Sequence, residues 1–243
     1  MRGIFITFEG CERVGKTTQI KRLRRYLEES GQAKNFVFTR EPGGTPTADK
    51  IRALILDKDN AALTARAEAL LYAASRSQHV EELILPALNE GKNVICDRYY
   101  ASSVAYQGYG RGLGEEYIRA INGYALSAAI PDITVFLDRS PDSSFIRKGQ
   151  PDRIESESLE FHKRVYEGFV KQCAMRNAQC PTVESQTAEY STADEKKIPL
   201  YGEVGSVAGR SDFKGCYIRI VPSEPDVTHR EILRALRERG IIK

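Results

Sequence analysis

The chain has 243 residues, of which 41% are hydrophobic and 28% charged, a composition typical of a globular protein rather than a disordered or fibrous one. Its 36 basic and 33 acidic side chains leave a net charge of +3, too even a balance for a protein that coats nucleic acid, although it allows one basic cleft for phosphates. There is no apolar run long enough for a membrane span and no leader-like start, and the five cysteines lack a compact spacing pattern, so we expect a cytoplasmic protein with reduced thiols.

Short apolar segments alternate with helical periodicity along the chain. The expected strands are Ile4–Phe8, Asn35–Thr39, Asn93–Cys96, Ile133–Leu137 and Tyr217–Val221. The expected helices are Thr17–Glu29, one long or broken helix over Leu63–Leu88, then Glu115–Ala128, Leu159–Met175 and Thr228–Arg239. This alternation predicts an α/β fold with a five-stranded parallel sheet and helices on both faces. Ligands bind such sheets at the carboxyl ends of the strands, so the residues after each strand are the candidates for function.

One stretch interrupts the alternation. Residues 176–215 are polar, rich in Ser, Thr, Gly and charges, and show no clear helical period. A structureless loop of that length is uncommon inside a compact domain. We therefore expect a single domain over residues 1–243 with an inserted polar segment at about 176–215, in the form of a hairpin or a flap.

The segment after the first strand has the pattern G-x-x-x-x-G-K-[ST] of a phosphate-binding P-loop. It consists of Gly10, Cys11, Glu12, Arg13, Val14, Gly15, Lys16 and Thr17. The glycines let successive backbone N–H groups face a polyphosphate, and the following helix adds the positive end of its dipole. Lys16 would reach the β and γ phosphates of a nucleotide and Thr17 would ligate Mg²⁺. Glu12 and Arg13 stand where these phosphates gather, which favours a role for both.

Two further segments offer groups for phosphates and metal. Asp97 and Arg98 follow the third strand, where an aspartate can hold Mg²⁺ and an arginine offers a planar fork to a phosphate. The basic segment with Arg147, Lys148 and Arg153 resembles a lid that closes cations over transferring phosphates, although a solvated basic loop is the alternative. The three histidines show no metal-ligand spacing.

Several motifs together resemble the thymidylate kinase family. The resemblance covers Met1 to about Met175 and again Tyr217 to the end. It is carried by Phe8-Glu9-Gly10 leading into the P-loop, Thr39-Arg40-Glu41-Pro42-Gly43-Gly44-Thr45, Ala73 to Val80, Asp97 to Gly108, and Asp152-Arg153-Ile154-Glu155. The resemblance implies a P-loop kinase fold and a transferase that phosphorylates dTMP to dTDP with MgATP, in dTTP biosynthesis, usually as a homodimer without nucleic-acid or membrane partners.

The same resemblance implies how the acceptor nucleotide is held. Spacing alone does not assign these roles. In this family pattern Pro42 belongs to the acceptor site, Tyr72 would stack on thymine and Arg76 would bond its carbonyl edge. Ser103 and Gln107 would read the base. In the same way, Tyr106 would lie against the sugar and disfavour a 2′-hydroxyl.

The remaining residues of the family pattern would bind the phosphate groups and the magnesium ion. Arg98 would hold the dTMP phosphate and Asp97 would serve the magnesium. Glu12 would approach the 3′-hydroxyl or the water network of the ion. Arg147, Lys148 and Arg153 would be the lid cations, and among these and Arg13 we expect Arg153 to contribute most to transfer.

The chain departs from the family pattern in two places. Members with basic lids usually carry a small residue where this chain has Arg13, and the insertion at about 176–215 has no counterpart. Two alternatives stay open: a kinase for another nucleoside monophosphate or a deoxynucleoside, and a catalytically inactive nucleotide-binding protein on the same scaffold. A GTPase is disfavoured because the sequence has no N/T-K-x-D guanine motif.

Overall fold

A parallel sheet forms the centre of the structure, a computed structural model that describes residues 1–141, 151–177 and 216–243. Its strands are β1 (Phe5–Glu9), β2 (Phe36–Arg40), β3 (Asn93–Asp97), β4 (Ile133–Leu137) and β5 (Cys216–Ile220). They pair in the order β2-β3-β1-β4-β5, and every pair is parallel. The predicted five-stranded parallel sheet is therefore confirmed. The insertion predicted at about 176–215 lies outside the described residues, apart from the end of one helix.

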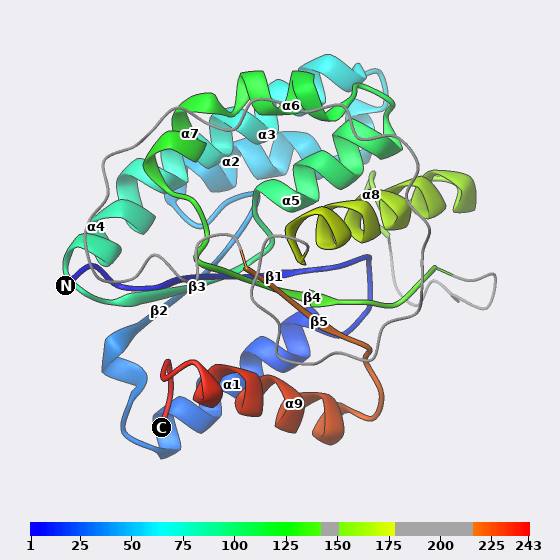
Figure 1. Cartoon of the computed structure of the whole chain (residues 1–243). Helices are drawn as coiled ribbons and strands as arrows, with labels where there is room; N and C mark the ends of the chain where they lie inside the picture. The colour runs from blue at the N-terminus through cyan, green and yellow to red at the C-terminus, as the bar shows by residue number, and fades with distance from the viewer. Residues whose placement is uncertain (142–150, 178–215) are drawn as a thin grey trace.

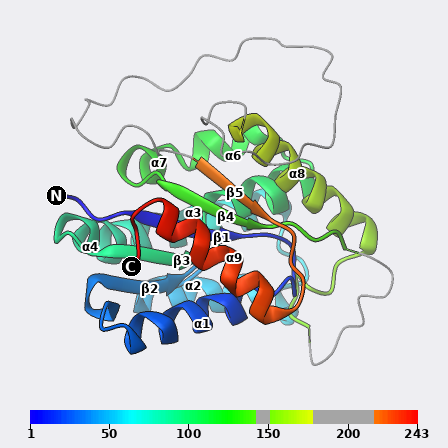
Figure 2. The ribbon, with the colours of Figure 1, turned by 60° about the horizontal axis from the view of Figure 1, so that its bottom comes forward.

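Helices cover both faces of this sheet, as predicted (Figure 1). Two of them, α1 (Lys16–Glu29) and α9 (Pro225–Glu238), lie side by side on one face, and Figure 2 shows this face turned forward. The other face carries α2 (Pro46–Leu56), α3 (Ala65–His79), α4 (Leu85–Asn89), α5 (Tyr100–Ser103), α6 (Glu115–Ile121), α7 (Gly123–Ala128) and α8 (Leu159–Asn177). Apolar side chains fill both layers because strands buried on two faces have no solvent side.

The helical stretch 63–88, expected as one long or broken helix, is a broken one: a π-helical turn, η3 (Val80–Ile84), separates α3 from α4. Two short 3₁₀ turns, η1 (Ala33–Asn35) and η2 (Lys58–Asn60), occur in connections. Helix α2 was not predicted, although Thr45 caps its N-terminus and Pro46 occupies its first turn, a recognisable start signal.

A second unpredicted helical segment lies under the site. It joins α5 to the π-helical η4 (Val104–Gly110) and is buried on nearly all sides. A helix buried all round shows no amphipathic period, so the periodicity could not reveal it. It packs against α8 and brings Ser103, Tyr106 and Gln107 inward.

The register of the sheet brings three loops together. Phe8 pairs with Asp97, and Asp97 pairs with Arg40 on the other side. The backbone bonds continue past the strands: Glu41 N donates to Asp97 O at 2.9 Å, and Arg98 N donates to Phe8 O at 3.0 Å. The segments after β1, β2 and β3 therefore meet at one edge, as the strand-end rule predicts.

The described cysteines are not all in the same state. Cys11, Cys96 and Cys173 are buried and form no disulfide, whereas Cys216 is disulfide-bonded. The expectation of five reduced thiols is therefore wrong for Cys216. None of the described helices combines the length and apolar character that crossing a bilayer requires.

Candidate active site

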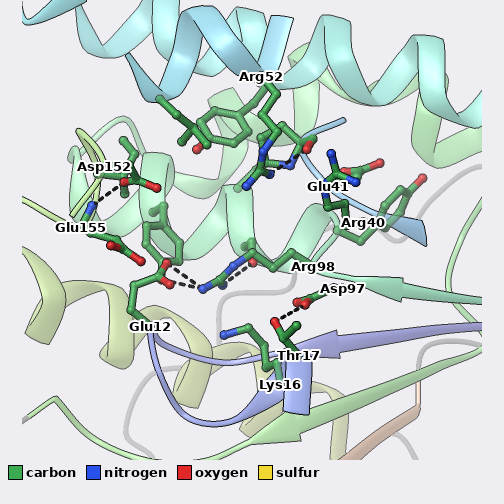
Figure 3. Close-up of a pocket in the computed structure, with 18 of the residues that line it drawn as sticks. Glu12, Lys16, Thr17, Arg40, Glu41, Arg52, Asp97, Arg98, Asp152 and Glu155 are labelled. Carbon is green, nitrogen blue, oxygen red and sulfur yellow. Dashed lines mark hydrogen bonds and ion pairs between the residues drawn. The ribbon is translucent and has the colours of Figure 1, made fainter. Parts of the chain in front are cut away.

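A cavity of about 490 Å³ opens at the carboxyl ends of β1, β2 and β3 (Figure 3). Of the residues predicted for the site, it is lined by Glu12, Arg13, Gly15, Lys16, Thr17, Pro42, Tyr72, Arg76, Asp97, Arg98, Ser103, Tyr106 and Gln107. Residues that the sequence did not single out for a role also line it, chiefly Arg40, Glu41, Arg52, Ser102, Asp152 and Glu155. The structure thus brings the P-loop and the predicted base-binding residues to one cavity.

The P-loop joins β1 to α1 and bends sharply at its first residue. Gly10 has φ 139°, and a Cβ there would lie 2.6 Å from the carbonyl oxygen of Leu137, so no other residue fits without a shift. Cys11 and Val14 turn their side chains into the core, which leaves only their backbone for a ligand. Gly10, Cys11 and Val14 are the P-loop residues that do not line the cavity.

Lys16 lies against the P-loop backbone. Its Nζ donates to the carbonyl oxygens of Gly10 at 3.0 Å and Cys11 at 2.6 Å. Burial, followed by the nearby charge of Arg98, lowers the pKa of Lys16 to about 8, and the carboxylates of Glu12 and Asp97 oppose this shift. The negative charge of an arriving polyphosphate would raise the pKa of Lys16 again.

Thr17 and Asp97 meet across the floor of the site. Thr17 Oγ1 donates to Asp97 Oδ2 at 2.8 Å, so one hydroxyl and one carboxylate oxygen lie together beside the P-loop (Figure 3). Hard oxygen donors of this kind suit Mg²⁺, which usually takes one or two protein ligands and completes its shell with waters and substrate phosphates. The pair fits the predicted metal role.

Arg98 is the most extensively bonded cation of the cavity. Its Nη1 donates to Gly10 O at 2.8 Å and to Ser102 Oγ at 3.1 Å, and its Nη2 donates to Glu12 Oε1 at 2.7 Å and to Tyr106 Oη at 3.2 Å. These bonds use four of its five N–H groups. Arg98 therefore contributes a fixed positive charge between the P-loop and η4.

Glu12 is held as a carboxylate by this arrangement. Its Oε1 also accepts a bond of 2.8 Å from Tyr106 Oη. Burial raises the pKa of Glu12, but the charges of Arg98 and Lys16 and the bond from Tyr106 outweigh burial and bring the pKa to about 2.

A buried glutamate supports the turn that carries Arg98. Arg98 has φ 69°, in the left-handed region that a non-glycine residue rarely adopts. Glu9 accepts from Tyr99 N at 2.8 Å and from Ser102 Oγ at 2.6 Å, which fastens the residues beyond the turn to β1. Burial raises the pKa of Glu9. The sequence motif contained Glu9 without suggesting this role.

Arg76 reaches the other end of the cavity from α3. Its guanidinium donates to Glu41 Oε2 at 2.8 Å, to Asn122 Oδ1 at 2.6 Å and to Ser103 Oγ at 3.0 Å, and its side chain is almost fully buried. His79 bonds the second oxygen of Glu41 at 3.0 Å. Glu41 stood in a recognised motif, but no sequence signal pointed to Asn122, which lies far along the chain.

The lid residues are placed unevenly. Arg147 and Lys148 lie outside the described residues. Arg153 does not line the main cavity: its Nε donates to Ile55 O at 2.8 Å and its Nη2 to Glu68 Oε2 at 2.7 Å. Arg13 does line it, with its Nη2 4.0 Å from Glu155 Oε2.

The fold and the site together indicate the class of protein to which this chain belongs. A P-loop between the first strand and the first helix of a parallel sheet, with a Thr–Asp pair beside it and a second polar end to the same cavity, is the arrangement of a P-loop nucleotide kinase.

Comparison with known proteins narrows the class. The thymidylate kinase family matches residues 8–193. The thymidylate kinase of Finegoldia magna is 53% identical over 169 residues, covering 68% of this chain and 82% of the relative. That of Clostridium novyi is 47% identical over 175 residues, covering 70% of this chain and 84% of the relative. The crystal structure of thymidylate kinase from Ehrlichia chaffeensis superimposes with a TM-score of 0.66 at 28% identity, over 97% of this chain and 99% of the other. The chain belongs to the thymidylate kinase family.

Proposed function

We propose that this protein transfers the terminal phosphoryl group of ATP to dTMP, giving ADP and dTDP, as part of dTTP biosynthesis. One observation carries the proposal: a single cavity has phosphate-binding groups of the P-loop at one end and a polar end around Arg76 and Gln107 at the other. A kinase for nucleoside monophosphates needs both ends in one space, because donor and acceptor phosphates must meet in line.

The acceptor base would occupy the end formed by α3 and η4. Tyr72 lines this end and offers a ring for stacking, while Arg76 retains N–H groups beyond its three protein bonds that can donate to a carbonyl oxygen of thymine. Ser103 and Gln107 add polar atoms beside it. Pro42 closes the cavity from the side of β2.

The sugar and phosphate of the acceptor would lie between this end and the P-loop. Tyr106 stands there with its hydroxyl tied to Glu12 and Arg98, so its ring can exclude a 2′-hydroxyl. Arg98 supplies a fixed positive charge for the acceptor phosphate. Arg40 and Arg52 line the same cavity and add two cations that sequence reasoning had not assigned.

The donor phosphates would follow the P-loop backbone, with Lys16 turning from Gly10 O and Cys11 O to the β and γ phosphates. Magnesium, when bound, neutralises charge that develops on the phosphate oxygens. Thr17 and Asp97 would hold it. Glu12, a carboxylate at neutral pH, would accept from a hydroxyl or a water in this region.

The phosphoryl group in transfer needs a further cation, and the positions of Arg13 and Arg153 indicate which of them provides it. Arg13 lines the cavity, while Arg153 bonds to Glu68 outside it. We therefore assign the larger share of charge stabilisation to Arg13, and Arg153 contributes where it exchanges Glu68 for a phosphate. Arg147 and Lys148 stay proposed lid cations on the family resemblance.

The proposal also includes a homodimeric assembly and a cytoplasmic location, which do not depend on the geometry of the cavity. A homodimer follows from the family resemblance. A cytoplasmic site of action is supported by the reduced state of Cys11, Cys96 and Cys173, while the disulfide at Cys216 is unusual for that compartment.

The test is a coupled assay of ADP formation with MgATP and equal concentrations of dTMP, dUMP, dCMP, UMP and thymidine. We expect dTMP to have the highest kcat/KM. The matched control is Lys16→Met, which removes the charge, keeps much of the volume and abolishes turnover with every acceptor. A higher kcat/KM for dCMP, UMP or thymidine would overturn the assigned acceptor, and full activity of Lys16→Met would overturn the donor site.

A further inference from the structure

A buried glutamate outside the proposed catalytic set contacts one of the base-reading residues. Glu68, on α3, is completely buried and does not line the main cavity. Its Oε1 accepts from Gln107 Nε2 at 2.9 Å and from Arg111 Nε at 3.2 Å. Its Oε2 accepts from Arg111 Nη2 at 3.0 Å and from Arg153 Nη2 at 2.7 Å.

The two arginines make Glu68 an acceptor with a fixed orientation. Arg111 bonds both carboxylate oxygens through its planar fork, and Arg153, one of the expected lid cations, bonds one of them. A carboxylate paired in this way offers lone pairs only and has no hydrogen to donate. Whatever group faces it must therefore be a donor.

This requirement decides which end of the Gln107 amide faces Glu68. If the amide were reversed, its oxygen would lie against a carboxylate oxygen, and two acceptors would repel each other. The NH₂ end therefore faces Glu68 and the carbonyl oxygen faces away from it. That oxygen is buried and has no hydrogen-bond partner among the described residues. A buried acceptor without a partner is a rare feature that a ligand donor would relieve.

We propose that Glu68 is a positioning residue for acceptor specificity: it holds Gln107 so that the amide oxygen accepts the N3–H of thymine. The proposal rests on the proposed function, since Gln107 lines the acceptor end of the cavity. Thymine and uracil carry a hydrogen on N3, whereas cytosine presents a lone pair there. The fixed amide favours the first two bases and opposes cytosine, in addition to the donors of Arg76.

Two nearly isosteric acceptors test this directly. 5-Methyl-dCMP has the size and the methyl group of dTMP but lacks N3–H and carries an amino group at position 4. The measured quantity is the ratio of kcat/KM for dTMP to that for 5-methyl-dCMP. A defect in folding or in phosphate binding lowers both rates together and leaves this ratio unchanged, so the ratio separates positioning from a structural role.

Three variants complete the experiment. In Glu68→Gln the residue facing Gln107 offers a donor as well as an acceptor, the amide is free to reverse, and we expect the ratio to fall about tenfold. Glu157→Gln is the matched control: Glu157 bonds Arg111 Nη1 at 2.5 Å in the same ion cluster but has no bond to Gln107, so the ratio stays at the wild-type value. The exchange variant E68Q/Q107E moves the acceptor-only carboxylate to position 107 and places an amide donor opposite it at position 68, and we expect it to restore or raise the ratio.

The outcomes are distinguishable. An unchanged ratio in Glu68→Gln, or an equal fall in Glu157→Gln, overturns the proposal. If Glu68→Gln does not fold, the exchange variant decides: a retained preference for dTMP supports the proposal and a lost one overturns it. A wild-type chain that phosphorylates neither acceptor refutes the proposed function and this inference with it. If the wild type is active on dTMP and the ratio is the same in Glu68→Gln, only the inference is refuted.

Discussion

Replacing Arg98 by methionine tests two roles of this side chain. It supplies positive charge to the site, and it neutralises the buried carboxylate of Glu12. Arg98 makes four hydrogen bonds to protein groups, and its side chain and that of Glu12 are only 15% and 21% exposed. Removing one partner of a buried pair costs about 3–5 kcal/mol because the remaining charge stays unpaired. Since both groups keep some contact with water, we expect about 3 kcal/mol, which lowers Tm by about 6–12 °C in a chain of this size.

A second substitution shows whether the unpaired charge is the cause. In the double variant Arg98→Met/Glu12→Gln no carboxylate remains to be compensated, so we expect its loss to be about 2 kcal/mol smaller than the sum of the two single losses. Urea unfolding followed by circular dichroism measures these free energies. Turnover behaves differently: Arg98→Met lowers kcat on the order of 10²-fold, and the second change does not restore it. If the losses in unfolding free energy of the two single variants add up to that of the double variant within about 0.5 kcal/mol, the ion pair of Arg98 and Glu12 does not form in solution.

The pH dependence of the same pair has a defined sign. The pKa of Glu12 is depressed in the folded state to about 2, so its contribution is fully present above the unfolded value and is lost as the pH falls through the folded one. The difference in unfolding free energy between wild type and Glu12→Gln is therefore expected to shrink below pH 4.5 and to be largely gone near pH 2. A difference that stays constant over this range would contradict the assigned pKa.

The remaining predictions concern three other parts of the site. Lys16 has a pKa of about 8 in the protein without nucleotide and is expected to be fully protonated beside phosphates, so ATP binding at pH 8 should take up about half a proton. Calorimetry in buffers of different ionisation enthalpy measures this proton uptake, and Lys16→Met should abolish it. Arg13→Ala is expected to lower kcat at least about tenfold, whereas Arg153→Ala should lower Tm and leave kcat within about threefold, and the reverse pattern would assign transfer to the lid. Tyr106→Ala should raise the kcat/KM of UMP relative to dUMP about tenfold, while Tyr106→Phe, which keeps the ring, should not; equal ratios in both variants would exclude steric rejection of the 2′-hydroxyl.

The amino-acid sequence alone determined the features that depend on neighbouring residues. The P-loop from Gly10 to Thr17 is recognisable because phosphate binding needs glycine, lysine and a hydroxyl at fixed spacing directly before a helix. The alternation of strands and helices followed from periodicity, and it predicted that the residues after β1 and β3 would meet. The hydroxyl–carboxylate pair of Thr17 and Asp97 is the result of that local pattern and of the strand-end rule.

Only the tertiary structure decided which partners the buried charges take. Arg76 is held by Glu41 and Asn122, which are 35 and 46 residues away along the chain, and no local pattern encodes such a pair. Arg153 stood in a basic segment and was expected at the phosphates, yet its closest acceptor in space is Glu68, 85 residues earlier. A buried charge binds whichever opposite charge the packing of helices brings within hydrogen-bond distance, because leaving it unpaired costs more than any preference of the local sequence.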